Sequence, residues 1–454
     1  MTSRQERLLE VGSLARVEGE GALHLVLDRG RVTEARLNIY EPPRFFEAFL
    51  RGRSYTEVPD ITARACEMCP VAYQLSACRA IEDAFGVSVG PDVRSLRRLL
   101  YCGEWIENHA LHIHLLHAPD FLGYPDATEL AKDHRAVVAR GLALKKTGND
   151  LVELVGGRAI HPVNVRVGGF HRAPPRSELD DFKNRLDDAL EAAVLTVRWV
   201  AGFEFPDFQT PHALLTLDDP GPKGGARSGG GPRYPIDAGD GVITTAGIGF
   251  PLEDFEHFVS ETQVAHSTAL HARLRGVGTY LTGPLARYNL AGPRLWPVAA
   301  DAARSAGLGR VERNPFRSVL VRAVELVQAV AEARAIIESY TPPDPPAAAI
   351  RPRAGRGYGA TEAPRGLLYH RYDLDEQGVI TAARIVPPTA QNQAAMEADL
   401  RLVAQAGAQL TDAQLTARCE QAIRNYDPCV SCSTHFLRLH RDERRHRHLD
   451  PAGS

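Results

Sequence analysis

Apolar and polar residues alternate along residues 22–40 and again along residues 366–387. A period of two is typical of a strand with one buried face. Turn residues interrupt each stretch, Asp28-Arg29-Gly30 in the first and Asp375–Gly378 in the second. The pattern therefore predicts two β-hairpins, one near the start of the chain and one in its last third.

Four longer stretches repeat their apolar residues every three or four positions, which is the period of a helix with one buried face. Ser177, with Asp180 three positions on, is a suitable N-cap for one of them. The proline-rich breaker Thr341–Pro346 ends another. The predicted helices cover residues 94–117, 178–200, 316–338 and 394–424.

These elements predict an α+β fold that is mainly helical, a long helix bundle with peripheral hairpins. The chain has no internal repeat, so we expect a single domain over residues 1–454. Residues 217–241 are rich in glycine and proline and predict a mobile surface loop.

The charge and the apolar runs of the sequence argue against a nucleic-acid partner, a signal peptide and a membrane span. A formal net charge of -3 gives no electrostatic argument for a nucleic-acid partner. The start of the chain has no apolar run of the kind found in signal peptides. No apolar run reaches the roughly 18 residues that a membrane span needs. We expect no direct membrane insertion, and attachment to a membrane through another subunit stays open.

Two C-x-x-C pairs stand at opposite ends of the chain, Cys66 with Cys69 and Cys429 with Cys432. Thiolates at this spacing can bind one soft metal, so the pairs predict a four-sulfur site that joins both ends, carried by the small sheets there. Structural zinc uses the same ligands, but zinc ribbons usually bring their pairs within about 15–20 residues. An iron–sulfur cluster is the other alternative. The odd total of seven cysteines argues against a disulfide framework and favours a reducing compartment.

The residues around the cysteines carry a resemblance to a known family. The sequence D-P-C-x-x-C-x-x-H is complete from Asp427 to His435. The motif R-x-C-G-x-C-x-x-x-H begins at Arg64 and departs at Glu67, in place of glycine, and at Tyr73, in place of histidine. With these and further collinear blocks, the chain resembles the large catalytic subunit of [NiFe] hydrogenases, most closely the soluble cytoplasmic bidirectional group. The further blocks are Arg16–Glu20, Glu41–Arg53, Trp105–Phe121, Gly156–Pro162, Glu362–Gly366 and Pro387–Asn392.

The resemblance implies reversible heterolytic cleavage of H2 to protons and electrons at a Ni-Fe centre, with CO and CN ligands on the iron. It implies that Cys66 and Cys429 are terminal nickel ligands. It makes Cys69 and Cys432 bridge nickel to iron. Hydrogen is apolar, so a soft metal must bind it while a nearby base takes the proton.

Three residues outside the cysteine pairs resemble the family's proton and charge machinery. Arg365 resembles an arginine held over the metals as a base or electrostatic stabiliser. Asp427 is expected to orient that guanidinium in a bidentate contact. Glu18 resembles the glutamate that accepts a proton from a cysteine, and Glu20 stands where many relatives have histidine. Asn108 stands where some relatives have a second acidic residue, which predicts less negative charge around the metals.

The resemblance also implies a hard cation, Mg or Fe, between Glu47 and His435 near the C-terminus. Family members commonly lose a C-terminal extension after this histidine, so residues 436–454 are a candidate cleavable tail. A maturation endopeptidase and nickel chaperones are therefore expected partners. The alternative is that the tail stays in place as a short packed strand.

Electrons must leave through another protein, because the chain has no further cysteine set. The resemblance implies an Fe-S small subunit, followed by flavin and NAD(P)-reductase subunits, and the chain has no glycine fingerprint for either cofactor. Two other readings stay open: an H2-sensing or membrane-associated hydrogenase subunit, and a non-catalytic zinc-binding relative, which Glu67 and Tyr73 would favour. The histidines of residues 109–117 are assigned to packing and hydrogen bonding.

Overall fold

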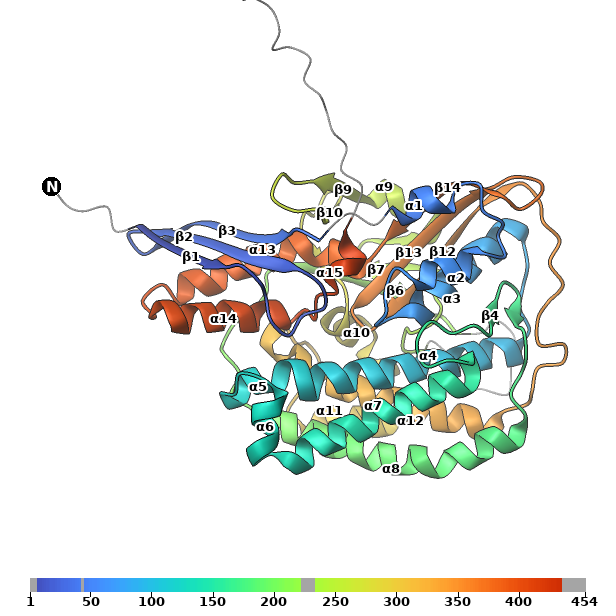
Figure 1. Ribbon diagram of the computed structural model, residues 1–454, viewed down its shortest axis with the longest axis horizontal. Coiled ribbons are helices and arrows are strands. Elements are labelled where there is room, and N and C mark those ends of the chain that lie inside the picture. The colour runs from blue at the N-terminus through green and yellow to red at the C-terminus, as the bar shows by residue number, and fades with distance from the viewer. Residues whose placement is uncertain (1–5, 42–44, 222–232, 435–454) are drawn as a thin grey trace, which may run out of the picture.

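The computed structural model describes residues 6–41, 45–221 and 233–434 (Figure 1). Four long helices form a bundle on one side of the molecule, and the sheets lie on the other side. Helix α12 is buried on nearly all its faces, which is why it lies at the centre of the bundle. The bundle helices are α4 (Pro91–Leu111), α7 (Arg135–Gly156), α8 (Arg176–Ala201) and α12 (Ser318–Ser339).

The predicted helices are present, with three corrections. Helix α8 begins after Pro175, so Ser177 lies inside its first turn and is not the N-cap. The stretch 394–424 is two helices, α13 (Pro388–Ala406) and α14 (Asp412–Arg424), because Gly407 ends the first and Thr411 starts the second with a capping box. The stretch 94–117 changes from α4 to the π-helix η1 (His112–His117).

Both predicted hairpins are confirmed, and each gains a strand that the pattern did not predict. The first sheet is β1 (Glu6–Val11), β2 (Gly21–Asp28) and β3 (Arg31–Ile39), with antiparallel neighbours. The second is β12 (Gly355–Ala363), β13 (Gly366–Leu374) and β14 (Ile380–Val386), also antiparallel. These two sheets lie at the two ends of the β half of the molecule.

A four-stranded sheet has the order β11-β6-β7-β8, and only its β11–β6 pair is parallel. The glycine-rich stretch joins β6 to β7, and its residues 222–232 lie outside the described ranges. The strands not yet given are β4 (Val165–Arg166), β5 (Gly169–Phe170), β6 (Ala213–Asp218), β7 (Gly241–Thr244), β8 (Gly249–Pro251), β9 (Val259–Gln263), β10 (Leu270–Leu274) and β11 (Tyr280–Leu281).

Shorter helices connect these parts. Within the described ranges, none of the helices has both the length and the apolar character needed to cross a membrane. The remaining helices are α1 (Phe46–Leu50), α2 (Val58–Ala63), α3 (Pro70–Phe85), α5 (Ala118–Leu122), α6 (Ala127–Asp133), α9 (Phe255–Phe258), α10 (Pro284–Ala291), α11 (Pro297–Ser305), α15 (Val430–Ser433) and the 3-10 turns η2 (Leu252–Asp254), η3 (Gly292–Arg294) and η4 (Pro315–Arg317).

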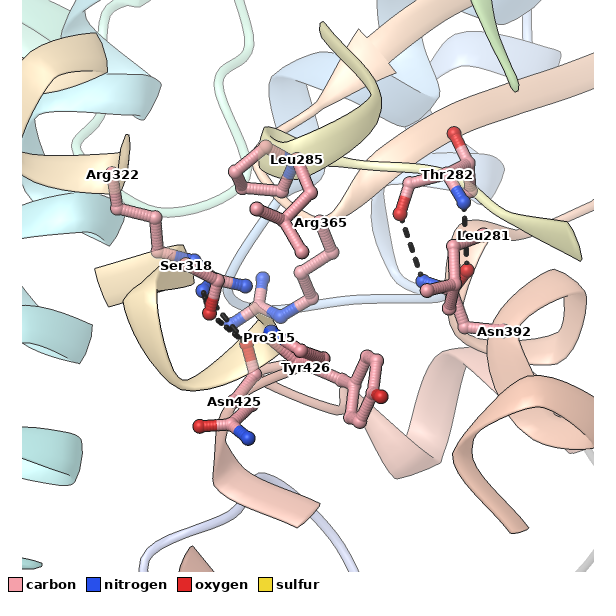
Figure 2. A pocket seen from close by; sticks show the side chains of 11 residues that line it. Leu281, Thr282, Leu285, Pro315, Ser318, Arg322, Arg365, Asn392, Asn425 and Tyr426 are labelled. Carbon is pink, nitrogen blue, oxygen red and sulfur yellow. Dashed lines mark hydrogen bonds between the residues drawn. The ribbon is translucent and has the colours of Figure 1, made fainter. Parts of the chain in front are cut away.

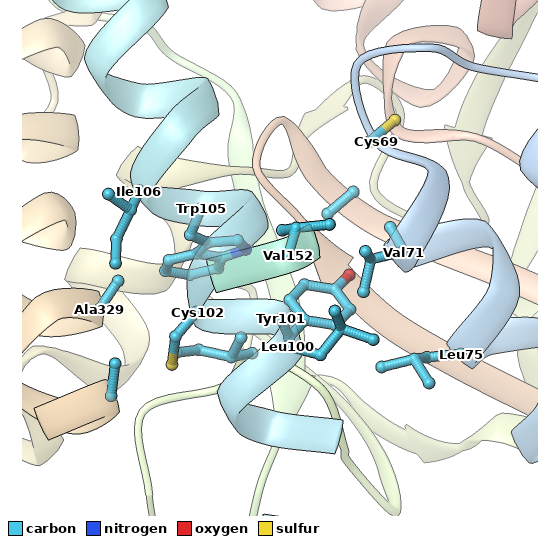
Figure 3. Close-up of a cluster of buried hydrophobic side chains, with 14 of the residues drawn as sticks. Cys69, Val71, Leu75, Leu100, Tyr101, Cys102, Trp105, Ile106, Val152 and Ala329 are labelled. Carbon is cyan, nitrogen blue, oxygen red and sulfur yellow. The ribbon is translucent and has the colours of Figure 1, made fainter. Parts of the chain in front are cut away.

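Helix α3, which begins directly after Cys69, packs closely on β12, and two glycines of β12 allow this close approach. A Cβ atom on Gly357 would lie 2.0 Å from the Ala80 carbonyl oxygen, and one on Gly359 would lie 2.5 Å from that of Ser76. Only glycine therefore lets the helix lie directly on the strand. Figure 3 shows the core where α3 meets α4, with Cys69 at its edge.

Candidate metal centre

The two cysteine pairs meet, and both stand at the start of a helix. Cys69 immediately precedes Pro70, the first residue of α3, and Cys429 immediately precedes α15. The expectation that the small sheets carry the cysteines is therefore wrong: α3 begins directly after the first pair, and α15 begins directly after Cys429 and contains Cys432. Proline at the first helical position fixes where α3 begins.

The four sulfurs converge from opposite ends of the chain. The Sγ atoms of Cys66 and Cys429 lie 3.4 Å apart, and those of Cys66 and Cys69 lie 2.8 Å apart. The Sγ of Cys432 is within 4.8 Å of those of Cys66 and Cys429. None of the four is in a disulfide. The prediction of a shared sulfur site is thus supported by the geometry.

The charges of these sulfurs also point to a cation. Burial opposes ionisation of Cys66, but hydrogen bonds from Cys429 and Cys432 outweigh it and lower its pKa well below the usual value. The pKa of Cys69 is raised, first by its hydrogen bond to Cys429, and that of Cys432 is raised by burial. These shifts favour the thiolate of Cys66 and oppose ionisation of Cys69 and Cys432. A soft metal ion would let all four ionise, so this donor set fits nickel and iron.

The Arg16–Glu20 block lies against the second cysteine pair. Glu18 and Cys429 form an isolated parallel bridge, and the Val430 amide donates to the Glu18 carbonyl at 2.9 Å. Gly19 makes this approach possible, because its φ is +86° and a Cβ there would lie 2.7 Å from that of Val430. Glu18 Oε2 lies 3.1 Å from the Cys429 sulfur and 3.1 Å from the Ser431 amide nitrogen.

The Glu18 carboxyl is suited to hold a proton. Burial, and then the charge of Cys429, raise its pKa to about 8. Desolvation disfavours the carboxylate, so the proton stays on this group at a pH where an exposed glutamate has lost it. Its position 3.1 Å from the Cys429 sulfur is compatible with the predicted role as proton acceptor, and that role stays a prediction.

The sequence did not predict two residues that lie beside Glu18, Ser431 and Glu41. The Ser431 hydroxyl donates to a Glu18 oxygen at 2.5 Å and lies 2.8 and 3.0 Å from the two carboxylate oxygens of Glu41. Glu20, by contrast, is exposed, and its contact with Glu41 is through its backbone amide at 3.3 Å. The only sequence signal for Glu41 is that it opens the Glu41–Arg53 block.

Arg365 lies in the turn between β12 and β13. Its Nε donates to the Asp427 backbone carbonyl at 2.7 Å, and its Nη1 donates to Asn108 Oδ1 at 3.0 Å. Its Nη2 lies 3.3 Å from each carboxylate oxygen of Asp427. The expected two-nitrogen contact with the carboxylate is therefore wrong. Asp427 has a φ of 51°, and in that conformation its own carbonyl takes the second nitrogen.

The guanidinium keeps its charge in this buried position. Burial alone would lower the pKa of Arg365, but the Asp427 carboxylate and the Cys429 sulfur hold it well above its ordinary value. Burial raises the pKa of Asp427 in spite of the arginine. A cavity of about 20 Å³, enough for one small molecule, adjoins this guanidinium. Figure 2 shows it between Arg365, Leu285 and Tyr426.

Glu67 and Tyr73, the two departures from the family motif, differ in their burial. Glu67 is exposed, so it brings no charge into the site. Tyr73 is buried, its ring centroid is 5.6 Å from that of His370, and its pKa is raised first by burial and then by the sulfur charges. The tyrosine is therefore a neutral hydroxyl beside the sulfurs.

Glu47 lies in α1 and its carboxylate accepts a hydrogen bond from the Ile385 amide at 2.8 Å. His435 and the tail 436–454 lie outside the described residues. The cation site of Glu47 and His435 and the cleavage of the tail therefore stay predictions. The histidine-rich stretch supports the packing assignment. His112 contacts the Arg424 carbonyl at 2.9 Å, and the His114 ring stacks on Trp199.

Comparisons with known proteins agree with this geometry. The family model described as nickel-dependent hydrogenase matches residues 44–150 and 314–435. The alpha subunit of sulfhydrogenase 2 from Pyrococcus furiosus is 34% identical over 95% of this chain and 100% of its own. The beta subunit of the NAD-reducing hydrogenase HoxS from Cupriavidus necator is 28% identical over 95% of each chain. A crystal structure of an NAD+-reducing [NiFe]-hydrogenase in the H2-reduced state superposes with a TM-score of 0.82, at 28% identity, over 94% of this chain and 99% of that one.

Proposed function

The chain belongs to the nickel-dependent hydrogenases and is the large, catalytic subunit of a [NiFe] hydrogenase. From this premise we propose that it cleaves H2 reversibly and heterolytically at a centre held by Cys66, Cys69, Cys429 and Cys432. The observation that carries the proposal is the convergence of these four sulfurs from both ends of the chain. When bound, the metals supply the soft site for H2 and the redox chemistry that side chains lack.

Arg365 provides the positive charge at this site. Its guanidinium is buried and held by Asp427 and Asn108 from two different segments, so its position is fixed before the reaction begins. A preorganised charge costs no reorganisation when charge develops nearby. The cavity of about 20 Å³ beside this guanidinium is not lined by any of the four cysteines, so it is not assigned to the metal centre.

Glu18 is the proposed first proton acceptor, because its carboxylate oxygen is 3.1 Å from the Cys429 sulfur. The Ser431 hydroxyl then joins it to Glu41, which is partly exposed. A hydroxyl both donates and accepts, so it can pass a proton between two carboxylates without carrying charge. Glu20 does not fit the next position, since its side chain points to solvent.

We further propose CO and CN ligands on the iron and a Mg or Fe ion bound by Glu47 and His435. A nickel chaperone and an endopeptidase that removes residues 436–454 belong to the same proposal. Intact mass tests the last part: the active enzyme is expected to end at His435, and a chain that ends at Ser454 with full nickel would contradict it.

Electrons are proposed to pass to an Fe-S small subunit and on through a flavin subunit to NAD(P). Support comes from the NAD-reducing relatives, which match along almost the whole chain. Because NAD(P) is a cofactor of the cell interior, a cytoplasmic complex follows from this proposal. Purification of the complex and an assay of H2-dependent NAD(P) reduction test this proposal. If the complex reduces an artificial dye with H2 but does not reduce NAD(P), then NAD(P) is not its electron acceptor.

Metal analysis and infrared spectroscopy of the purified enzyme test the centre itself. Nickel with iron, together with bands of metal-bound CO and CN, is the expected result. Zinc alone in the cysteine site would refute the proposal and favour a non-catalytic zinc-binding relative.

A further inference from the structure

Three metal-ligating side chains meet at a second place, apart from the cysteine site. His266 and His271 come from the segment that leads into and forms β10, and Glu397 comes from α13, which packs against β10 (Figure 1). One donor atom from each lies within 4.8 Å of the other two. Nothing in the proposed reaction uses these residues.

The contacts of this cluster leave one nitrogen unsatisfied. His266 Nε2 and Glu397 Oε1 lie 2.7 Å apart, and the same oxygen accepts from the Leu37 amide at 2.9 Å. His271 Nε2 faces the other carboxylate oxygen at 3.9 Å, too far for a hydrogen bond. His271 is only 6% exposed, and its Nε2 is buried without a partner.

Neither tautomer of His271 satisfies this arrangement. A protonated Nε2 has no acceptor within reach, and an unprotonated Nε2 directs its lone pair at a carboxylate, which is repulsive. A cation between the two groups satisfies both, because imidazole nitrogen and carboxylate oxygen are each ligands of it. We propose that His266, His271 and Glu397 bind a divalent ion of the zinc class.

Zinc is the ion that this donor set favours. Two imidazoles and one carboxylate give three of the four ligands of a tetrahedral site, at about 2.0–2.2 Å from the metal. The side chains of His266 and Glu397 are 20% and 16% exposed, so water can reach the fourth position. The separations between donors need only small movements to meet this geometry.

The site would fasten three segments that are distant in the sequence. Glu397 already joins α13 to β3 through Leu37. Ala269, between the two histidines, forms a bridge with Thr434, which follows the second cysteine pair. A bound ion would therefore hold residues 266–271 in place, and Thr434, the last described residue, pairs with this segment.

The test uses the purified enzyme with its nickel–iron centre in place, incubated with ZnCl2 and passed through a desalting column. We expect one zinc per large subunit in addition to nickel and iron. The zinc absorption edge should show nitrogen and oxygen ligands at about 2.0–2.1 Å, and sulfur at about 2.3 Å would place the zinc in the cysteine site and overturn the proposal.

Two variants and a control complete the test. His271→Ala should lose the zinc, and Glu397→Gln should weaken zinc binding while its side-chain oxygen still accepts from Leu37, which keeps the fold. His257→Ala changes an exposed histidine outside the cluster and should bind zinc as the parent does. Unchanged zinc content in folded Glu397→Gln and His271→Ala would overturn the proposal.

Discussion

The replacement Glu18→Gln separates proton transfer from metal binding. Glutamine has the same size, and its side-chain oxygen can still accept from the Ser431 amide, so the contact with the second cysteine pair stays. What is lost is a group that titrates. The present Oε2–Sγ distance of 3.1 Å is within the range of about 2.6–3.2 Å for direct proton transfer.

The expected loss follows from what such transfer contributes. General acid–base catalysis by a positioned group accelerates a step by roughly 10²–10⁴-fold, which corresponds to about 2.7–5.4 kcal/mol of barrier. Glu18→Asp is the matched comparison, because it keeps the titrating group but shortens the side chain by about 1.5 Å. Its oxygen would then lie beyond direct reach of the sulfur, so we expect a rate between the parent and the glutamine variant.

The assay is isotope exchange between D2 gas and water, with nickel measured on the same sample. Exchange in Glu18→Gln should fall by about 10²–10⁴ while nickel and the infrared bands of the centre stay normal. If exchange remains within about threefold of the parent at full nickel content, the proton leaves by another group and the reasoning is refuted.

Three further predictions concern the metals, the charge and the fold. Cys432→Ser should lose nickel and H2 uptake, because oxygen is a harder donor than sulfur; metal analysis with normal nickel would contradict this. Arg365→Lys should lower turnover by about 10²–10³, because an ammonium cannot hold the contacts to both Asp427 and Asn108; kcat at saturating H2 measures it. Arg287→Met should lower the free energy of unfolding by about 3–5 kcal/mol, measured by urea denaturation, because it leaves buried carboxylates at 2.7–3.0 Å without their cation.

The hydrophobic period predicted three of the four bundle helices, α4, α8 and α12, and both hairpins, because burial of one face shapes a sequence directly. It did not predict the fourth bundle helix, α7. It failed where a local signal interrupts the period. The break in 394–424 was readable from Gly407 and from the Thr411–Gln414 capping box. The π-helix was not, since a wide turn shifts the register by one residue and leaves the composition unchanged.

The cysteine site could be predicted because its spacing and its flanking residues are local. The contact of Ser431 with Glu41 could not, because it depends on how a loop near the start of the chain packs on α15. The same holds for His271 and Glu397, which belong to elements far apart in the sequence. Side chains with no common motif become neighbours only through the fold.

The position of Cys66 and Cys429 at opposite ends of the chain has a consequence for biosynthesis. A growing chain on the ribosome has Cys66 and Cys69 but lacks the second pair until Cys429, 363 residues after Cys66, and Cys432 have been made. A nascent or truncated chain therefore cannot complete the site. The complete four-sulfur site can therefore hold metal only after the chain has been made as far as Cys432, and a loaded centre requires that the two pairs have folded together.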